Sequence, residues 1–133
     1  MSRDLKANIS PAQSLAPAAQ SAAIDGAAVD LANFHRASVL IDTGTATGTT
    51  PSFTFEVQES NTTTPGDFTA VPAADLDGAA PVITTANDVA TYEIGYRGRK
   101  RYLRVVIKTV SGTTPVLPCS ALILRGSPRV APK

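Results

Sequence analysis

The chain has few of the residues on which enzymes and disulfide-stapled domains depend. Its 133 residues include one cysteine, one histidine and no tryptophan. One cysteine forms no internal disulfide, so the fold is not stapled and a reducing cytoplasm is the expected place of folding. No stretch approaches the roughly 18 consecutive apolar residues of a membrane-spanning helix. No apolar run follows the charged residues at positions 1–6 either, so we expect neither a membrane partner nor a secretory signal.

The same scarcity argues against a catalytic or metal site. A nucleophile needs a base within reach, but His35 is the only histidine, and Cys119 lies in an apolar segment where a thiol is inert. A zinc site needs about four ligands. Residues 75–78 (DLDG) match only a fragment of a calcium loop and suit an ordinary turn. We therefore expect no enzyme activity, no catalytic residue, no metal and no cofactor.

Three glutamates, Glu56, Glu59 and Glu93, are the material for a carboxylate pair of the kind that hydrolyses glycosides. Nothing in the sequence places two of them around a cleft, and exposed glutamates are common on strands. We therefore favour solvated strand residues over a catalytic pair.

Acidic residues are missing from positions 96–133. That part has nine basic residues and a net charge of +9, whereas residues 1–95 have eleven acidic and three basic residues and a net charge of −8. Such polarity has three explanations: pairing of basic and acidic strands within one fold, contact between molecules, or nucleic-acid binding. For the basic cluster we expect contacts with an acidic protein surface and not with nucleic acid. The candidate protein-contact residues are Arg97, Arg99, Lys100, Arg101 and Arg104.

Short strands separated by turn signals dominate the chain from residue 25 onward. The clearest is 52–60, where Phe53, Phe55 and Val57 alternate with polar residues as on a half-buried strand. The pattern predicts an all-β fold, an antiparallel β-sandwich or jelly roll of about seven to eight strands. We detect no internal sequence repeat.

The pattern also divides the chain into three parts. Residues 1–24 include an uncharged segment, 7–24, with seven alanines and two prolines, whose side chains are expected to lack the bulk to fold alone. We expect them to form an N-terminal arm that packs outside its own domain, and a disordered terminus is the alternative. Residues 25–126 are predicted to form the β-sandwich domain. Residues 127–133 contain two prolines and are predicted to form a tail that leaves the fold.

Two alternating runs, 90–96 and 101–107, are predicted to form a hairpin. The predicted register places Ile94 opposite Leu103, and a type II′ turn requires a positive φ at Gly98. The last strand, 115–125, is almost continuously apolar, which is typical of a strand covered on both faces. The predicted core consists of Phe53, Phe55, Val57, Leu103, Val105, Ile107, Leu122 and Leu124.

Four runs of the sequence carry a resemblance to a known family. They are AAVDLANFHRASVLIDTG, FEVQESNTTTPGDFTAVPAADLDG, YEIGYRGRKRYLRVVI and GSPRVAP. Together they resemble small tailed-phage virion proteins encoded beside the major capsid protein, and in particular capsid decoration, or cement, proteins. These motifs are turns and strand patterns, so they carry over no functional residues. The resemblance implies a β-sandwich or jelly-roll fold present in many copies on a shell.

The function that the resemblance implies is structural. We expect a virion protein that binds and stabilises the phage head shell, with the major capsid protein and further copies of itself, as a homo-oligomer, as partners. Its expected location is the capsid surface, after folding in the host cytoplasm. One alternative is a head–tail connector or other minor virion protein. Another is a carbohydrate- or surface-binding module on the virion, but seven aromatic residues leave little material for a binding platform.

Overall fold

The computed structural model describes residues 5–128 and is built almost entirely from β-strands. Five strands have six or more residues: β1 (Ile9–Gln20), β4 (Phe34–Thr43), β5 (Thr47–Ser60), β9 (Thr91–Tyr96) and β10 (Tyr102–Pro128). Five have two residues each: β2 (Ile24–Asp25), β3 (Val29–Asp30), β6 (Thr69–Ala70), β7 (Leu76–Asp77) and β8 (Val82–Ile83). Single 3-10 turns are η1 (Lys6–Asn8), η2 (Pro65–Asp67) and η3 (Ala73–Asp75). The predicted all-β class is confirmed. Within residues 5–128 no helix has the length and apolar character needed to cross a membrane.

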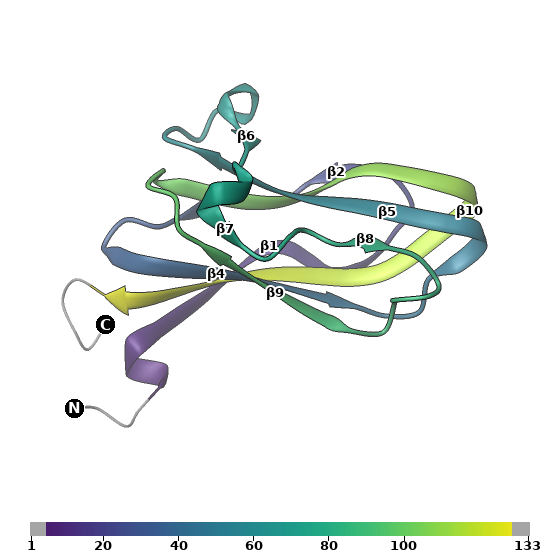
Figure 1. Cartoon of the computed structure of the whole chain (residues 1–133), viewed down its shortest axis with the longest axis horizontal. Coiled ribbons are helices and arrows are strands. Elements are labelled where there is room, and N and C mark those ends of the chain that lie inside the picture. Colours follow the sequence, from purple (N-terminus) through teal and green to yellow (C-terminus); the bar gives the residue numbers. More distant parts are fainter. Residues whose placement is uncertain (1–4, 129–133) are drawn as a thin grey trace.

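The strands form one ten-stranded antiparallel sheet that curls into a half-barrel (Figure 1). Its main order is β6-β5-β10-β4-β9-β7, while β1, β2 and β3 pair with β10 and β8 pairs with β5. Strand β10 runs through both layers of the curl, because residues 102–116 pair with β5 and residues 119–128 pair with β4. Residues 5–128 form ten strands, where seven or eight were predicted for the chain. The five two-residue strands are too short to show a periodic pattern in the sequence.

The core lies inside the curl and consists of alternate residues of the long strands. Phe53, Phe55 and Val57 of β5 are buried, as predicted. So are the predicted core residues at 103, 105 and 107 of β10. Leu122 and Leu124 were also predicted in the core, but they are only half-buried, and the neighbouring positions 117, 119, 121 and 123 face inward instead. Because residues 115–125 are apolar on both faces of the strand, their sequence does not indicate which face points into the core.

A repeated tetrapeptide bends two strands together. The sequence Gly-Thr-Thr-Pro occurs at 48–51 in β5 and again at 112–115 in β10, contrary to our expectation of no internal repeat. Both glycines have positive φ, 111° at Gly48 and 107° at Gly112. The register of the β5–β10 pairing shifts between residues 111 and 116, where the two copies face each other. The two copies therefore form one double bend in which both strands turn from one layer to the other.

The segment predicted to be an arm is instead an edge strand of its own domain. Strand β1 pairs with β10 from Ile9, opposite Gly126, to Gln20, opposite Leu117. Leu15 is 3% exposed and belongs to the core. The prediction that this segment packs outside the domain is therefore wrong for residues 9–20, and residues 1–4 lie outside the described part. Small side chains suffice here because the backbone bonds to β10, and an edge position tolerates the two prolines of the segment.

The predicted hairpin between 90–96 and 101–107 does not form. Strand β9 pairs with β4, which places Ile94 opposite Val39, whereas Leu103 at the start of β10 lies opposite Glu59 of β5. Gly98 does not have the predicted positive φ. The two runs alternate with the same period as the other strands, so each can pair with a strand other than its neighbour in the sequence. The connection 97–101 joins the two layers.

The end of the domain also differs from the expected boundary. Strand β10 continues to Pro128, so residues 127 and 128 stay in the sheet and do not begin a tail. Residues 129–133 of the predicted tail lie outside the described residues.

Candidate functional site: a basic hollow at one end of the sheet

Positive side chains gather where the connection 97–101 approaches the start of β4. A hollow of about 410 Å³ opens there, and its lining includes His35, Arg36, Arg99, Lys100 and Arg101 but no acidic residue. A second hollow of about 460 Å³ lies against the same connection and contains acidic residues 59 and 75 in its lining. Arg99 and Lys100 line both hollows, of which the first has only basic residues among its charged ones and the second is mixed.

The connection is held in place by hydrogen bonds at both ends. The hydroxyl of Tyr96 donates to Oε1 of buried Glu59 at 2.7 Å and accepts from the backbone N–H of Lys100 at 3.2 Å. The backbone N–H of Arg101 donates to Oδ1 of Asn61 at 3.2 Å. Burial, together with the Glu59 carboxylate, raises the pKa of Tyr96 far above its ordinary value, so its hydroxyl remains a donor. The basic side chains thus project from an ordered loop.

Gly98 allows the backbone of the connection 97–101 to lie against Tyr96, which is a different role from the one expected of it in a type II′ turn. A Cβ atom at this position would collide with the phenol ring of Tyr96. Gly98 is therefore required for the close approach of the backbone to the ring, and not for a left-handed backbone conformation.

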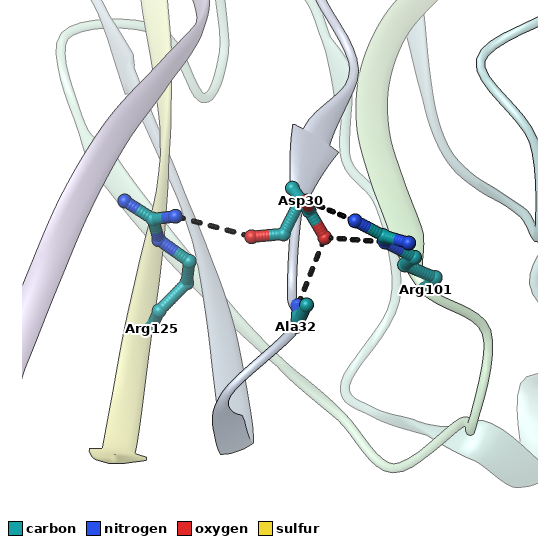
Figure 2. Close-up of polar contacts among 4 residues, drawn as sticks. All are labelled: Asp30, Ala32, Arg101 and Arg125. Carbon is teal, nitrogen blue, oxygen red and sulfur yellow. Dashed lines mark hydrogen bonds and ion pairs between the residues drawn. The ribbon is translucent and has the colours of Figure 1, made fainter. Parts of the chain in front are cut away.

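Arg101 is neutralised by a carboxylate of its own chain (Figure 2). Its Nε and Nη2 atoms donate to Oδ1 and Oδ2 of Asp30 at 3.0 and 2.9 Å, and the backbone N–H of Ala32 also donates to Oδ1, at 2.9 Å. The hydrogen bond from Arg101 holds the pKa of Asp30 below its ordinary value, against the opposing effect of burial. Nη1 of Arg125 donates to the backbone carbonyl of Asp30 at 3.1 Å. Asp30 on β3 thereby links Arg101, the residue before β10, to Arg125 near the end of that strand.

Arg104 and Arg97 also have partners inside the molecule. Arg104 is 7% exposed. Its guanidinium carbon lies 4.3 Å from the ring centroid of Phe68, its Nε donates to Gln58 at 2.8 Å and its Nη2 lies 3.9 Å from Asp25. Nη2 of Arg97 lies 3.7 Å from an exposed carboxylate at position 77. Three of the five candidate contact residues therefore follow the first explanation of the charge asymmetry, pairing within the fold.

The other two candidates, Arg99 and Lys100, are exposed and form no ion pair with any residue between positions 5 and 128. Arg36, which the sequence did not single out, is also exposed and unpaired within that range. It joins the site because β4 pairs with β9, so that Ala37 lies opposite Tyr96. No local signal connects position 36 with position 99. What remains after internal pairing is a concentrated positive surface.

The other chemistry-bearing residues are dispersed. Burial raises the pKa of Cys119 to about 11, so the thiol is a poor nucleophile. Glu56 bonds to Lys108 on the outside of β5, Glu59 bonds to Tyr96, and Glu93 lies exposed on β9. The described residues contain no group of three or more histidine, cysteine, aspartate or glutamate side chains that could hold a metal ion.

Comparison with known proteins does not assign the chain to a family: no family model matches it, and no curated protein matches it either.

Proposed function

We propose that this protein is a structural component of a tailed-phage virion, a decoration protein that attaches to the head shell through the basic hollow. The resemblance of its sequence runs to such proteins gives the class. Arg99 and Lys100 are exposed, form no ion pair with a described residue and line a hollow without acidic residues; they give the attachment surface and are the observation that carries the proposal.

Carboxylates of the major capsid protein are the expected partners of this surface. Arginine and lysine pair with carboxylates through charge-assisted hydrogen bonds. The backbone of the loop that carries Arg99 and Lys100 is already held by Tyr96 and Asn61, so little backbone entropy is lost on binding. Each exposed pair contributes only roughly 0–1 kcal/mol. Stable attachment therefore relies on many copies, which is the situation of a protein that covers a shell.

We also interpret the curled sheet as a variant of the jelly-roll or sandwich architecture expected of such proteins. Its support is the shared bend of β5 and β10, which folds one paired ribbon back over a single core. This role does not require a particular number of strands in each layer, since the loops at one end of the sheet provide the contacts.

The test replaces Arg99 and Lys100 together with glutamate. Head particles of the parent virus that lack this protein are incubated with the wild-type or the variant protein, and the bound fraction is measured by sedimentation at increasing salt. We expect the wild-type protein to bind and to be released as salt rises, because surface charge pairs are screened. The charge-reversed variant should bind much more weakly at every salt concentration.

The matched control keeps both charges by exchanging them, Arg99→Lys with Lys100→Arg, and should bind nearly as well as the wild type. Reversing Arg101 is avoided because it would break the pair with Asp30 inside the molecule. Equal binding of the charge-reversed variant would contradict the proposed surface. Tight DNA binding at physiological salt, abolished by the same substitutions, would instead favour a connector or packaging role.

A further inference from the structure

One outward face of the sheet has the composition of an interface. It is formed by β1, the second half of β10, β4 and β9. In the register of these strands, Leu122 lies opposite Leu40, and Leu124 lies opposite Ser38. These leucines alternate with the buried residues of the same strands, so they point away from the core, and they are only half-buried. Strand β10 is therefore apolar on a face that its own domain does not bury fully.

Two opposite charges flank this apolar centre on β4. Arg36, Leu40 and Asp42 share one face of the strand because they are separated by even numbers of residues. Arg36 and Asp42 are both exposed, and they are six residues apart, about 20 Å along a strand. Neither forms an ion pair among residues 5–128; Asp42 accepts a hydrogen bond from the hydroxyl of Thr91 at 3.1 Å.

We propose that this face binds a second copy of the chain, with the two β4 strands antiparallel and related by a two-fold axis that passes near position 39. In that arrangement Arg36 of each copy lies over Asp42 of the other. Leu122 lies over Leu124, and the side chain of Glu93 lies over Gly95 of the second copy. With Arg36 over Asp42 and Leu122 over Leu124, the face is complementary to itself along β4 and β10, as a two-fold interface requires.

The available area is consistent with this occupant. Four strands spaced about 4.8 Å apart, over about eight residues of β1, β4 and β10 and the six residues of β9, give roughly 500 Å² per copy, or about 1,000 Å² in total. This lies at the lower limit for specific protein interfaces. A weak dimer in solution is therefore expected, which becomes more populated where copies are concentrated.

The test measures self-association of the purified chain by sedimentation equilibrium, so its outcome does not depend on attachment to a shell. We expect a monomer–dimer equilibrium. Arg36→Asp and Asp42→Arg should each weaken the dimer at least about tenfold, which corresponds to about 1.4 kcal/mol. The double variant with both changes restores opposite charges in this geometry, so it should dimerise like the wild type. Asp67→Arg, on an exposed turn away from the face, is the matched control and should leave dimerisation unchanged.

Leu122→Lys is a second variant that should abolish the dimer, and thermal melts establish that each variant is folded. A wild-type chain that stays monomeric at all concentrations, or that forms trimers, would overturn the proposal. So would single charge reversals without effect, or a double variant that fails to recover.

Discussion

The double bend of β5 and β10 leads to a sharp prediction about two glycines. Gly48 and Gly112 have φ values of 111° and 107°, which side-chain-bearing residues rarely adopt. A Cβ atom on Gly48 would lie 2.7 Å from the carbonyl oxygen of Thr114, and one on Gly112 would lie 2.7 Å from that of Thr50. Both contacts are with backbone, which cannot move aside without opening the pairing.

We expect Gly48→Ala and Gly112→Ala to destabilise the protein by similar amounts. Unfavourable backbone dihedrals cost roughly 1–3 kcal/mol, and overpacking costs roughly 1–3 kcal/mol. Alanine offsets about 0.4–1 kcal/mol of this by restricting the unfolded chain. The free energy of unfolding should therefore fall by about 3 kcal/mol for each variant, measured by urea denaturation with an unchanged m-value.

The double variant should lose less than the sum of the two single losses. Both clashes span the same gap between the strands, so opening it for one alanine relieves the other. Gly66→Ala is the matched control, because no atom lies within 4 Å of its Cβ position and its φ is not positive. It should stay within about 0.5 kcal/mol of the wild type. A Gly112→Ala variant as stable as the wild type, or losses at the two sites that differ by more than about 1.5 kcal/mol, would refute the reasoning.

Two further predictions concern the core and the ion pair on β3. Phe53 is fully buried, so Phe53→Ala should cost about 3–5 kcal/mol in urea denaturation, and a loss below about 1 kcal/mol would contradict its place in the core. The pKa of Asp30 is lower in the folded state than in the unfolded state, so its contribution to stability is present above about pH 4 and is lost as pH falls through the folded-state pKa. Asp30→Asn should therefore be less stable than the wild type at pH 7, with a smaller difference near pH 3; a difference that does not change with pH would argue against the pair with Arg101.

The parts of the fold that the sequence predicted are those where period and composition agree. In β5, Phe53, Phe55 and Val57 alternate with polar residues, and the structure buries all three. In β10 the residues from 115 to 125 are apolar on both faces, so position alone does not distinguish Leu122 from Ile123. The pairing with β4 determines which of the two residues is buried: Ile123 lies opposite buried Val39 and therefore points into the core.

The failed hairpin has a related cause. Alternating strands of equal length are interchangeable partners, and the sequence favoured the nearest one. The actual pairing involves residues far apart in the chain: β9 pairs with β4, and Tyr96 at its end bonds to Glu59 of β5. The bond between Tyr96 and Glu59 also holds the loop 97–101 in place. The sequence does not show that these two residues meet, so neither the strand pairing nor the geometry of the site could be predicted from it.

The charge asymmetry shows how much of a site depends on the fold. Along the sequence, negative and positive charge are separated into two parts of the chain. In space, β10 places its basic residues beside the acidic strands, and four ion pairs each join a residue after position 95 to one before it. Four of the nine basic residues after position 95 are thereby paired inside the molecule, as shown by Arg101 with Asp30 and Lys108 with Glu56. Arg99 and Lys100 lie on the connection between β9 and β10 and form no ion pair with a described residue, and Arg36 of β4 lines the same hollow. The charge available for a partner therefore depends on which basic residues find no acidic partner within the fold, and this is why the proposed attachment surface consists of Arg99 and Lys100 and not of the whole basic cluster.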